Sequence, residues 1–134
     1  MEIVVILWKI KPGADNRQAF FKHLAETLTI DDKTGLFGEF LSRPRSADEA
    51  GPEFSIFGAH PSDEYALYFN VAIWDTLDAF RAQVLDKYVK SDSADEPFLF
   101  EPPSRMALSP EQRRVGDGQL PAGDHLWPFD TRPE

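Results

Sequence analysis

The chain of 134 residues is long enough for one domain with a single hydrophobic core. Its hydrophobic fraction of 42% and aromatic fraction of 13% exclude an intrinsically disordered chain, and its net charge of -9 disfavours binding to nucleic acid or a membrane surface. The sequence contains no cysteine, which excludes disulfides, thiolate catalysis and cysteine-ligated metal and makes the cytoplasm the expected compartment.

The N-terminal segment predicts a strand that is buried on both faces. Between Met1 and Lys11, apolar side chains occupy both of the alternating sets of positions. The segment is too short for a signal peptide or a membrane span. Pro12 and Gly13 end the strand, and apolar residues at helical spacing then predict a helix over about residues 15–29.

The segment between residues 36 and 64 predicts a second strand followed by a long loop. Residues 36–42 have the composition of a strand, and Gly38 indicates a β-bulge or the close approach of another segment. A polar loop is expected over residues 43–64, and its FSIFGA sequence fits either a short strand or an apolar flap.

The strongest pattern lies where an apolar strand passes directly into an amphipathic helix. From Tyr65 to Trp74 the one polar side chain is Asn70, which predicts a central strand buried on both faces. Asp75 stands at the expected N-cap of the following helix. The apolar side of this helix consists of Leu77, Phe80, Val84, Leu85 and Tyr88.

The last core strand is expected within residues 98–108, and the rest of the chain forms an extended arm. Residues 109–134 show no hydrophobic periodicity, but they carry large apolar side chains that we expect to dock on folded protein. Trp127 and Phe129 are the expected anchors. We therefore divide the chain into a domain over residues 1–108 and an arm over residues 109–134.

The predicted order of elements is strand, helix, strand, strand, helix, strand. With right-handed crossovers, this order gives an α+β fold of the ferredoxin-like βαββαβ type, with a four-stranded antiparallel sheet and both helices on one face. The helices leave the second face bare, whereas the first and third strands are apolar on both faces. A homodimer in which a partner subunit covers that face is therefore expected.

The sequence FNVAIWDTLDAF, residues 69–80, resembles the antibiotic-biosynthesis-monooxygenase-like proteins of the dimeric α+β barrel superfamily. The shared feature is a strand ending in Trp, then an acidic or hydroxyl cap and a helix with an early aromatic residue. The resemblance implies a dimeric α+β barrel in which each subunit holds a small molecule between its sheet and helices. It also implies a cofactor-independent monooxygenase acting on an aromatic or polyketide-like substrate.

In these monooxygenases an Asn and a Trp four residues apart on this strand hold a phenolic substrate, and Asn70 and Trp74 match that spacing. Residues four apart on a strand share a face, so the amide and the indole would look into one space. The Tyr of the following helix is Phe80 in this chain. The haem-degrading branch needs an Asn on the first strand and a Trp and a His near the second helix, and these are missing.

Each candidate residue has a functional and a structural interpretation. Asn70 and Trp74 are candidate catalytic residues, and His23 is the best candidate for a general base. The structural alternatives are a buried amide bonded to backbone, a core aromatic residue and a helix-edge histidine bonded to a neighbour. The candidate wall residues of the substrate site are Tyr68, Phe80 and Trp8.

Three functions remain open from the sequence. No motif for haem, flavin, phosphate or metal is present, so no cofactor is expected. The chain is then an enzyme of the monooxygenase type, a non-catalytic small-molecule binding protein, or a structural dimer whose pocket is filled by its own side chains. A cavity of roughly 300–1,000 Å³ beside Asn70 would favour the first two functions, and a solid core would favour the third.

Overall fold

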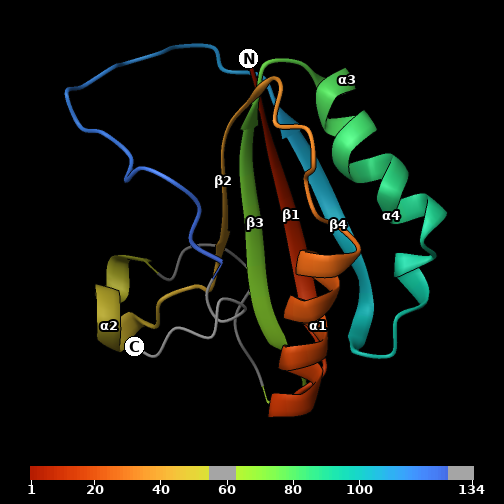
Figure 1. Ribbon diagram of the computed structural model, residues 1–134. Coiled ribbons are helices and arrows are strands. Elements are labelled where there is room, and N and C mark those ends of the chain that lie inside the picture. Colours follow the sequence, from red (N-terminus) through yellow and green to blue (C-terminus); the bar gives the residue numbers. More distant parts are fainter. Residues whose placement is uncertain (55–62, 127–134) are drawn as a thin grey trace.

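The computed structural model describes residues 1–54 and 63–126, and its centre is a four-stranded antiparallel sheet (Figure 1). The strands are β1 Glu2–Ile10, β2 Leu36–Ser42, β3 Ala66–Trp74 and β4 Leu99–Leu108. Their order in the sheet is β2-β3-β1-β4, and all three neighbouring pairs are antiparallel. The predicted ferredoxin-like order of strands is therefore confirmed.

Two long helical segments cover one face of this sheet (Figure 1). The first is α1, Ala14–Glu26, which ends earlier than the sequence predicted. The second contains α3 (Leu77–Phe80) and α4 (Asp86–Lys90), joined into one helix by the π-helical turn Arg81–Leu85. A π-helical turn holds one residue more than a regular α-helical turn. No helix in the described parts of the chain is long and apolar enough to cross a membrane.

The second helix begins one residue later than expected. Its N-cap is Thr76, whose hydroxyl accepts a hydrogen bond from the Ala79 N–H at 3.2 Å. The expected cap, Asp75, instead donates its backbone N–H to the Gly35 carbonyl at 2.7 Å. Because this bond keeps residue 75 paired with the segment that enters β2, the helix starts after it.

The long loop after β2 contains a short helix that the sequence analysis did not predict. Helix α2, Ala47–Ala50, lies on the other side of the sheet from α1 (Figure 1). Ser46 and Glu49 form a capping box, in which the Ser46 hydroxyl accepts from the Glu49 N–H and the Glu49 carboxylate accepts from the Ser46 N–H. The FSIFGA sequence lies outside the described residues.

The hydrophobic core lies between the sheet and the helices. Phe20 of α1 is its centre, with ring centroids 5.2 Å from Trp8, 5.3 Å from Tyr68 and 5.7 Å from Phe98. Strands β1 and β3 alternate, so that one set of side chains faces this core. The core side chains of these two strands are Val4, Ile6, Trp8, Ile10, Tyr68, Ala72 and Trp74.

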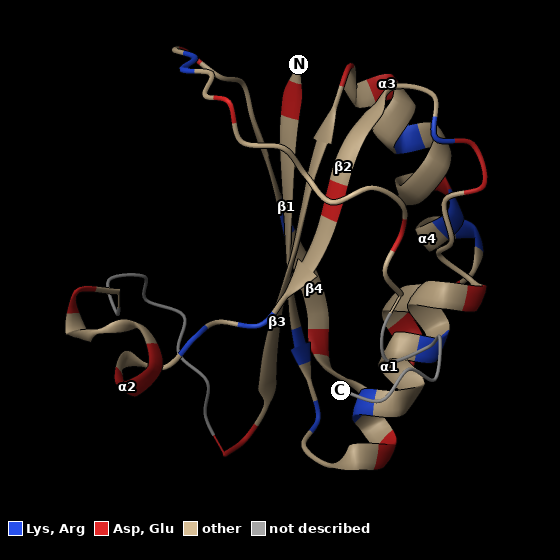
Figure 2. Ribbon diagram, turned by 60° about the vertical axis from the view of Figure 1, so that its left-hand side comes forward, with Lys and Arg blue, Asp and Glu red and all other residues tan. Residues whose placement is uncertain are grey.

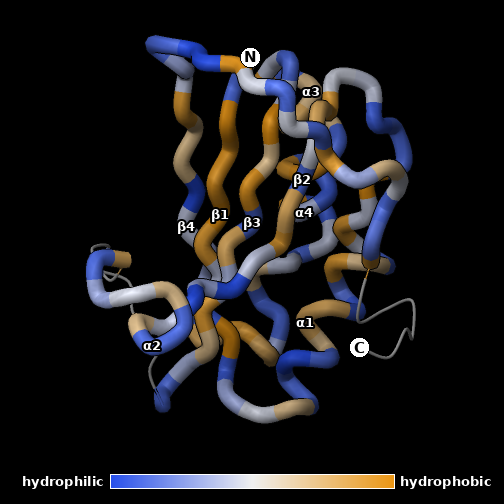
Figure 3. The backbone as a smooth tube through the Cα atoms, turned by 90° about the vertical axis from the view of Figure 1, so that its left-hand side faces the viewer, coloured by the Kyte–Doolittle hydropathy of each residue, from blue (hydrophilic) through white to orange (hydrophobic). Residues whose placement is uncertain are grey.

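The opposite face of the sheet, which we call the open face, is also apolar, since hydrophobic residues follow one another along the central strands β1 and β3 (Figure 3). The strand register places Phe40, Val71, Val5 and Met106 side by side across the four strands. Phe40 is 44% exposed and Met106 is 56% exposed, so large apolar groups on this face meet solvent. The sequence prediction that the central strands are apolar on both faces is confirmed.

The described part of the arm, residues 109–126, runs on the side of the open face from the β4 edge to the β2 edge (Figures 1 and 3). It forms neither helix nor strand, and Asp124 pairs with Lys33. Leu120 lies 3.6 Å from the position that a Cβ atom on Gly38 would occupy. The register of β2 also shifts between Leu36 and Gly38, which confirms the predicted bulge. Trp127 and Phe129, the expected anchors, lie outside the described residues.

Candidate functional site

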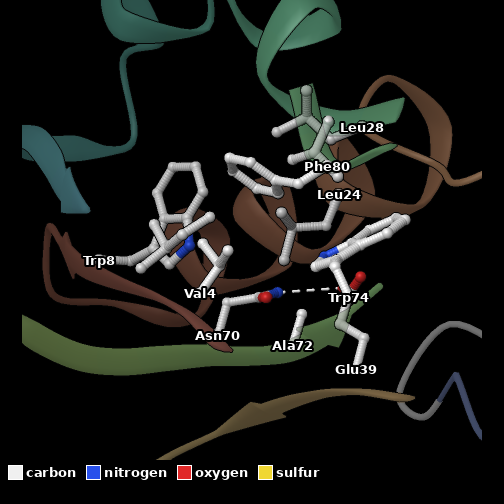
Figure 4. Close-up of a pocket in the computed structure, with 11 residues that line it drawn as sticks. Val4, Trp8, Leu24, Leu28, Glu39, Asn70, Ala72, Trp74 and Phe80 are labelled. Atoms are coloured by element: carbon white, nitrogen blue, oxygen red, sulfur yellow. Dashed lines mark hydrogen bonds between the residues drawn. The ribbon is translucent and has the colours of Figure 1, made fainter. Parts of the chain in front are cut away.

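A small cavity between the sheet and the helices, which we call the Asn70 cavity, contains four of the six residues that the sequence selected (Figure 4). Strands β1, β2 and β3 form its floor, and α1 and the second helix form its roof. Its lining consists of Val4, Ile6, Trp8, Leu24, Leu28, Glu39, Asn70, Ala72, Trp74, Phe80 and Val84. Its volume is about 40 Å³, which is room for water or a diatomic molecule.

Asn70 is buried in the floor of the Asn70 cavity and bonds to another side chain. On β3 it lies between Ile6 of β1 and Leu41 of β2, and both of these neighbours are apolar. Its amide Nδ2 donates a hydrogen bond to Oε1 of Glu39 at 3.1 Å. The sequence pointed to backbone or a substrate as the partner of this amide, whereas the structure provides a carboxylate.

Glu39 is the polar residue of the Asn70 cavity that was not predicted from the sequence. It is the acidic residue in the middle of β2 (Figure 2), and its register opposite Ala72 directs it to the helix side of the sheet. As a whole the residue is exposed on an edge strand, but its carboxyl end reaches the cavity. Burial of that end raises the pKa of Glu39, and the hydrogen bond from Asn70 partly opposes the rise. A single charge in an otherwise apolar strand was the available signal.

Two indole N–H groups in the lining have no hydrogen-bond acceptor among the described residues. They belong to Trp8, which is 3% exposed, and Trp74, which is fully buried. A buried donor without an acceptor costs about 1–3 kcal/mol. In Figure 4 the two tryptophans lie on opposite sides of Asn70. The lining therefore presents two unused donors on either side of an amide–carboxylate pair.

His23 and Tyr68 lie outside the Asn70 cavity. The Nε2 atom of His23 forms a 2.8 Å hydrogen bond with the Ser93 hydroxyl, and its Nδ1 atom is 3.6 Å from a Glu96 carboxylate oxygen. Burial lowers the pKa of His23, and the charge of Glu96 partly opposes this. His23 and Glu96 line a separate surface groove of about 390 Å³. Tyr68 packs against Phe20 in the aromatic core.

The chemistry available in the Asn70 cavity is that of hydrogen bonding and proton transfer. The tryptophan and amide N–H groups suit a carbonyl or phenolate oxygen, and the carboxylate of Glu39 can accept a proton. The aromatic rings of Trp8, Trp74 and Phe80 suit contact with a flat apolar ligand. Within residues 1–54 and 63–126, no cluster of three or more potential ligand side chains is placed to bind a metal ion.

Comparisons with known proteins identify the fold. No protein-family model matches the sequence, and no curated protein does either. A monooxygenase from the ActVA-Orf6 gene of Streptomyces coelicolor, solved in complex with the ligand nanaomycin D, aligns over 87% of this chain and 92% of its own. It is 14% identical, with a TM-score of 0.53.

A second solved structure has a similar fold. Rv0793 from Mycobacterium tuberculosis aligns over 86% of this chain and 100% of its own, with 17% identity and a TM-score of 0.52. At these identities the likeness concerns the fold. It confirms the α+β fold that the predicted order of elements and the resemblance of residues 69–80 both indicated.

Proposed function

We propose that this chain is a cofactor-independent monooxygenase that acts on an aromatic small molecule in the Asn70 cavity. The observation that carries the proposal is the pair of buried, unpaired indole N–H groups of Trp8 and Trp74 on either side of Asn70. Buried donors in folded proteins are nearly always paired with protein, water or ligand, and the oxygen atoms of a bound aromatic ligand would supply acceptors for these two. The monooxygenase from Streptomyces coelicolor has the same fold and a bound ligand, which supports this choice.

The substrate enters only if the lining moves. The cavity of about 40 Å³ is far smaller than the roughly 300–1,000 Å³ of sites for drug-sized ligands. Its floor is a hydrogen-bonded sheet, whereas its roof consists of apolar side chains from the helices, including Leu24 and Val84, together with Leu28, which follows α1. We therefore expect binding of an aromatic ring to shift these helices away from the sheet.

A structural dimer without a ligand is the second candidate function. The small volume of the Asn70 cavity favours it, because the core is nearly solid. In this case the Asn70–Glu39 hydrogen bond serves only to satisfy a buried amide. Both candidate functions include a homodimer whose partner subunit covers the open face.

Oxygen consumption with a panel of quinols and anthrones tests the proposal. The wild-type protein is expected to consume oxygen with at least one of them, without added cofactor. Asn70→Ala should lower turnover at least about fivefold, because one lost hydrogen bond is worth about 1 kcal/mol or more. Asn16→Ala is the matched control, since the Asn16 amide bonds to the Pro12 carbonyl outside the Asn70 cavity.

The indole groups provide a second readout. In ¹H–¹⁵N NMR spectra, the resonances of Trp8 and Trp74 should move downfield when an oxygenated ring binds, and an unsubstituted aromatic hydrocarbon should leave them unchanged. Trp8→Phe and Trp74→Phe assign the two signals. If no quinol or anthrone is bound or oxidised, the monooxygenase proposal is wrong and the structural dimer remains. If Asn70→Ala is destabilised but turns over normally, Asn70 is part of the scaffold and the reaction does not take place in the Asn70 cavity as proposed.

A further inference from the structure

Glu39 is the one titratable side chain among the 11 residues that line the Asn70 cavity. A reaction that proceeds without a cofactor needs a side chain to remove the proton of its substrate, and this side chain must come within hydrogen-bonding reach. His23, the base expected from the sequence, does not line the cavity. We propose that Glu39 is the base that deprotonates the substrate, an inference that rests on the proposed function.

The position of Glu39 suits a base that exchanges protons with solvent. The residue is exposed on the edge strand β2, whereas its carboxyl end reaches the Asn70 cavity. A proton taken from a ligand on one side can therefore leave to water on the other. The hydrogen bond from Asn70 at 3.1 Å fixes the direction of the carboxylate, so Asn70 is also a positioning residue for Glu39.

The surroundings of Glu39 make its carboxylate more basic than an exposed glutamate. Burial raises the pKa of Glu39, and the Asn70 hydrogen bond is the one opposing influence. The other lining residues, which come from β1, β3, α1, the segment after α1 and the second helix, carry no charge. A carboxylate with a raised pKa is a stronger base than an ordinary surface glutamate, and catalytic bases work best with a pKa near the operating pH.

The proposed step moves a single proton. The phenolic O–H bond of the substrate breaks, its electron pair stays on the substrate oxygen, and a new O–H bond forms on the Glu39 carboxylate. The unused indole N–H groups of Trp8 and Trp74 are the donors available to stabilise the phenolate that results. Such an electron-rich anion is the form of the ring that reacts with dioxygen, the second substrate of the proposed monooxygenase.

A hydroxyanthraquinone dye tests this step without turnover, because its absorption moves to longer wavelength when the phenol ionises. At a pH at which the free dye is neutral, the wild-type protein should bind it in the ionised form. Glu39→Gln, which has nearly the same shape, should bind the dye in its neutral form. Glu111→Gln is the control, since Glu111 is exposed in the arm, and it should behave as wild type.

The rate of turnover is the second measurement. Glu39→Gln should lower kcat by about 10²–10⁴-fold, the usual range for a lost general base, and should remove the acidic limb of the pH–rate profile. Glu39→Asp keeps a carboxylate and should recover part of the ionisation, which covers the case in which Glu39→Gln does not fold.

The outcomes separate the two proposals. If Glu39→Gln ionises the dye and keeps the wild-type pH–rate profile while Asn70→Ala loses turnover, Glu39 is not the base and the monooxygenase proposal stands. If the wild-type protein neither binds the dye nor consumes oxygen with any quinol or anthrone, the proposed function itself is overturned.

Discussion

The contact between Asn70 and Glu39 depends on the bulge at Gly38. A slip of one residue in strand register moves every side chain to the other face of a sheet. The register of β2 shifts between Leu36 and Gly38, so Glu39 lies opposite Ala72 on the helix side. Without this shift, Glu39 would lie opposite Val71 and point to the open face. One extra residue thus brings the carboxylate to the Asn70 cavity.

The raised pKa of Glu39 predicts a dependence of stability on pH. Above the ordinary value of 4.5, the unfolded chain loses the Glu39 proton before the folded protein does. The folded state then binds more protons, so its free energy of unfolding falls as pH rises through the interval between the two pKa values. This contribution is fully present below the unfolded value and is lost above the folded one.

Glu39→Gln removes that contribution, because an amide does not titrate. Urea denaturation between about pH 4 and about pH 8 should show that the wild-type protein loses more stability with rising pH than Glu39→Gln does. Glu111→Gln, which changes an exposed carboxylate of the arm, should follow the wild type. Parallel curves for wild type and Glu39→Gln would contradict the burial of the Glu39 carboxyl group.

Among the elements, the start of the second helix can be tested by mutation, because Asp75 and Thr76 are both chemically able to cap it. The structure assigns the N-cap to Thr76, whose hydroxyl accepts the Ala79 N–H. Thr76→Ala should therefore lower the free energy of unfolding by about 1 kcal/mol. Asp75→Asn should change it by less than about 0.5 kcal/mol. Urea denaturation measures both, and the reverse order would restore Asp75 as the cap.

The sequence predicted those elements whose signal is local. The spans of β2 and β3 follow from apolar runs bounded by turn residues, and each is found where expected. Helix α2 was missed although Ser46 and Glu49 have the spacing of a capping box, because no apolar run follows them to indicate a helix. The π-helical turn was also missed, since apolar residues around it fit a regular helix equally well.

The candidate site was predictable only in part, because some of its side chains are positioned by contacts between segments distant in the sequence. The alternation of β3 places Asn70 and Trp74 on one face, and the structure shows them in one cavity. Glu39 depends on the pairing of β2 with β3, which a single sequence does not specify. The periodicity of α1 places His23 near the apolar side of the helix, but the direction of its ring depends on Ser93, 70 residues away.

For the whole molecule, the open face predicts the oligomeric state. Its apolar side chains lie across all four strands, and large ones among them remain exposed in a single chain. Burying such a surface against a second copy is favourable by about 25 cal/mol per Å² of apolar area. Light scattering should therefore give twice the chain mass of 15.2 kDa.

Val71→Lys should separate the subunits, because it would bury a charge at the centre of the open face. Val89→Lys makes the same change on α4, where the residue is 65% exposed, and should leave the dimer intact. A folded wild-type monomer at micromolar concentration, or a Val71→Lys variant that still dimerises, would show that no second copy covers the open face.

The π-helical turn Arg81–Leu85 sets a rule for aligning this chain with its relatives. Each residue of a regular helix advances the direction of its side chains by about 100°. Val84, within the turn, lines the Asn70 cavity, and Tyr88, after the turn, is buried in the core. Deleting Ala82 would remove the extra residue, restore a regular helix and leave Tyr88 facing the core. An ungapped alignment to a protein without this turn therefore matches side chains that point in different directions on one side of it.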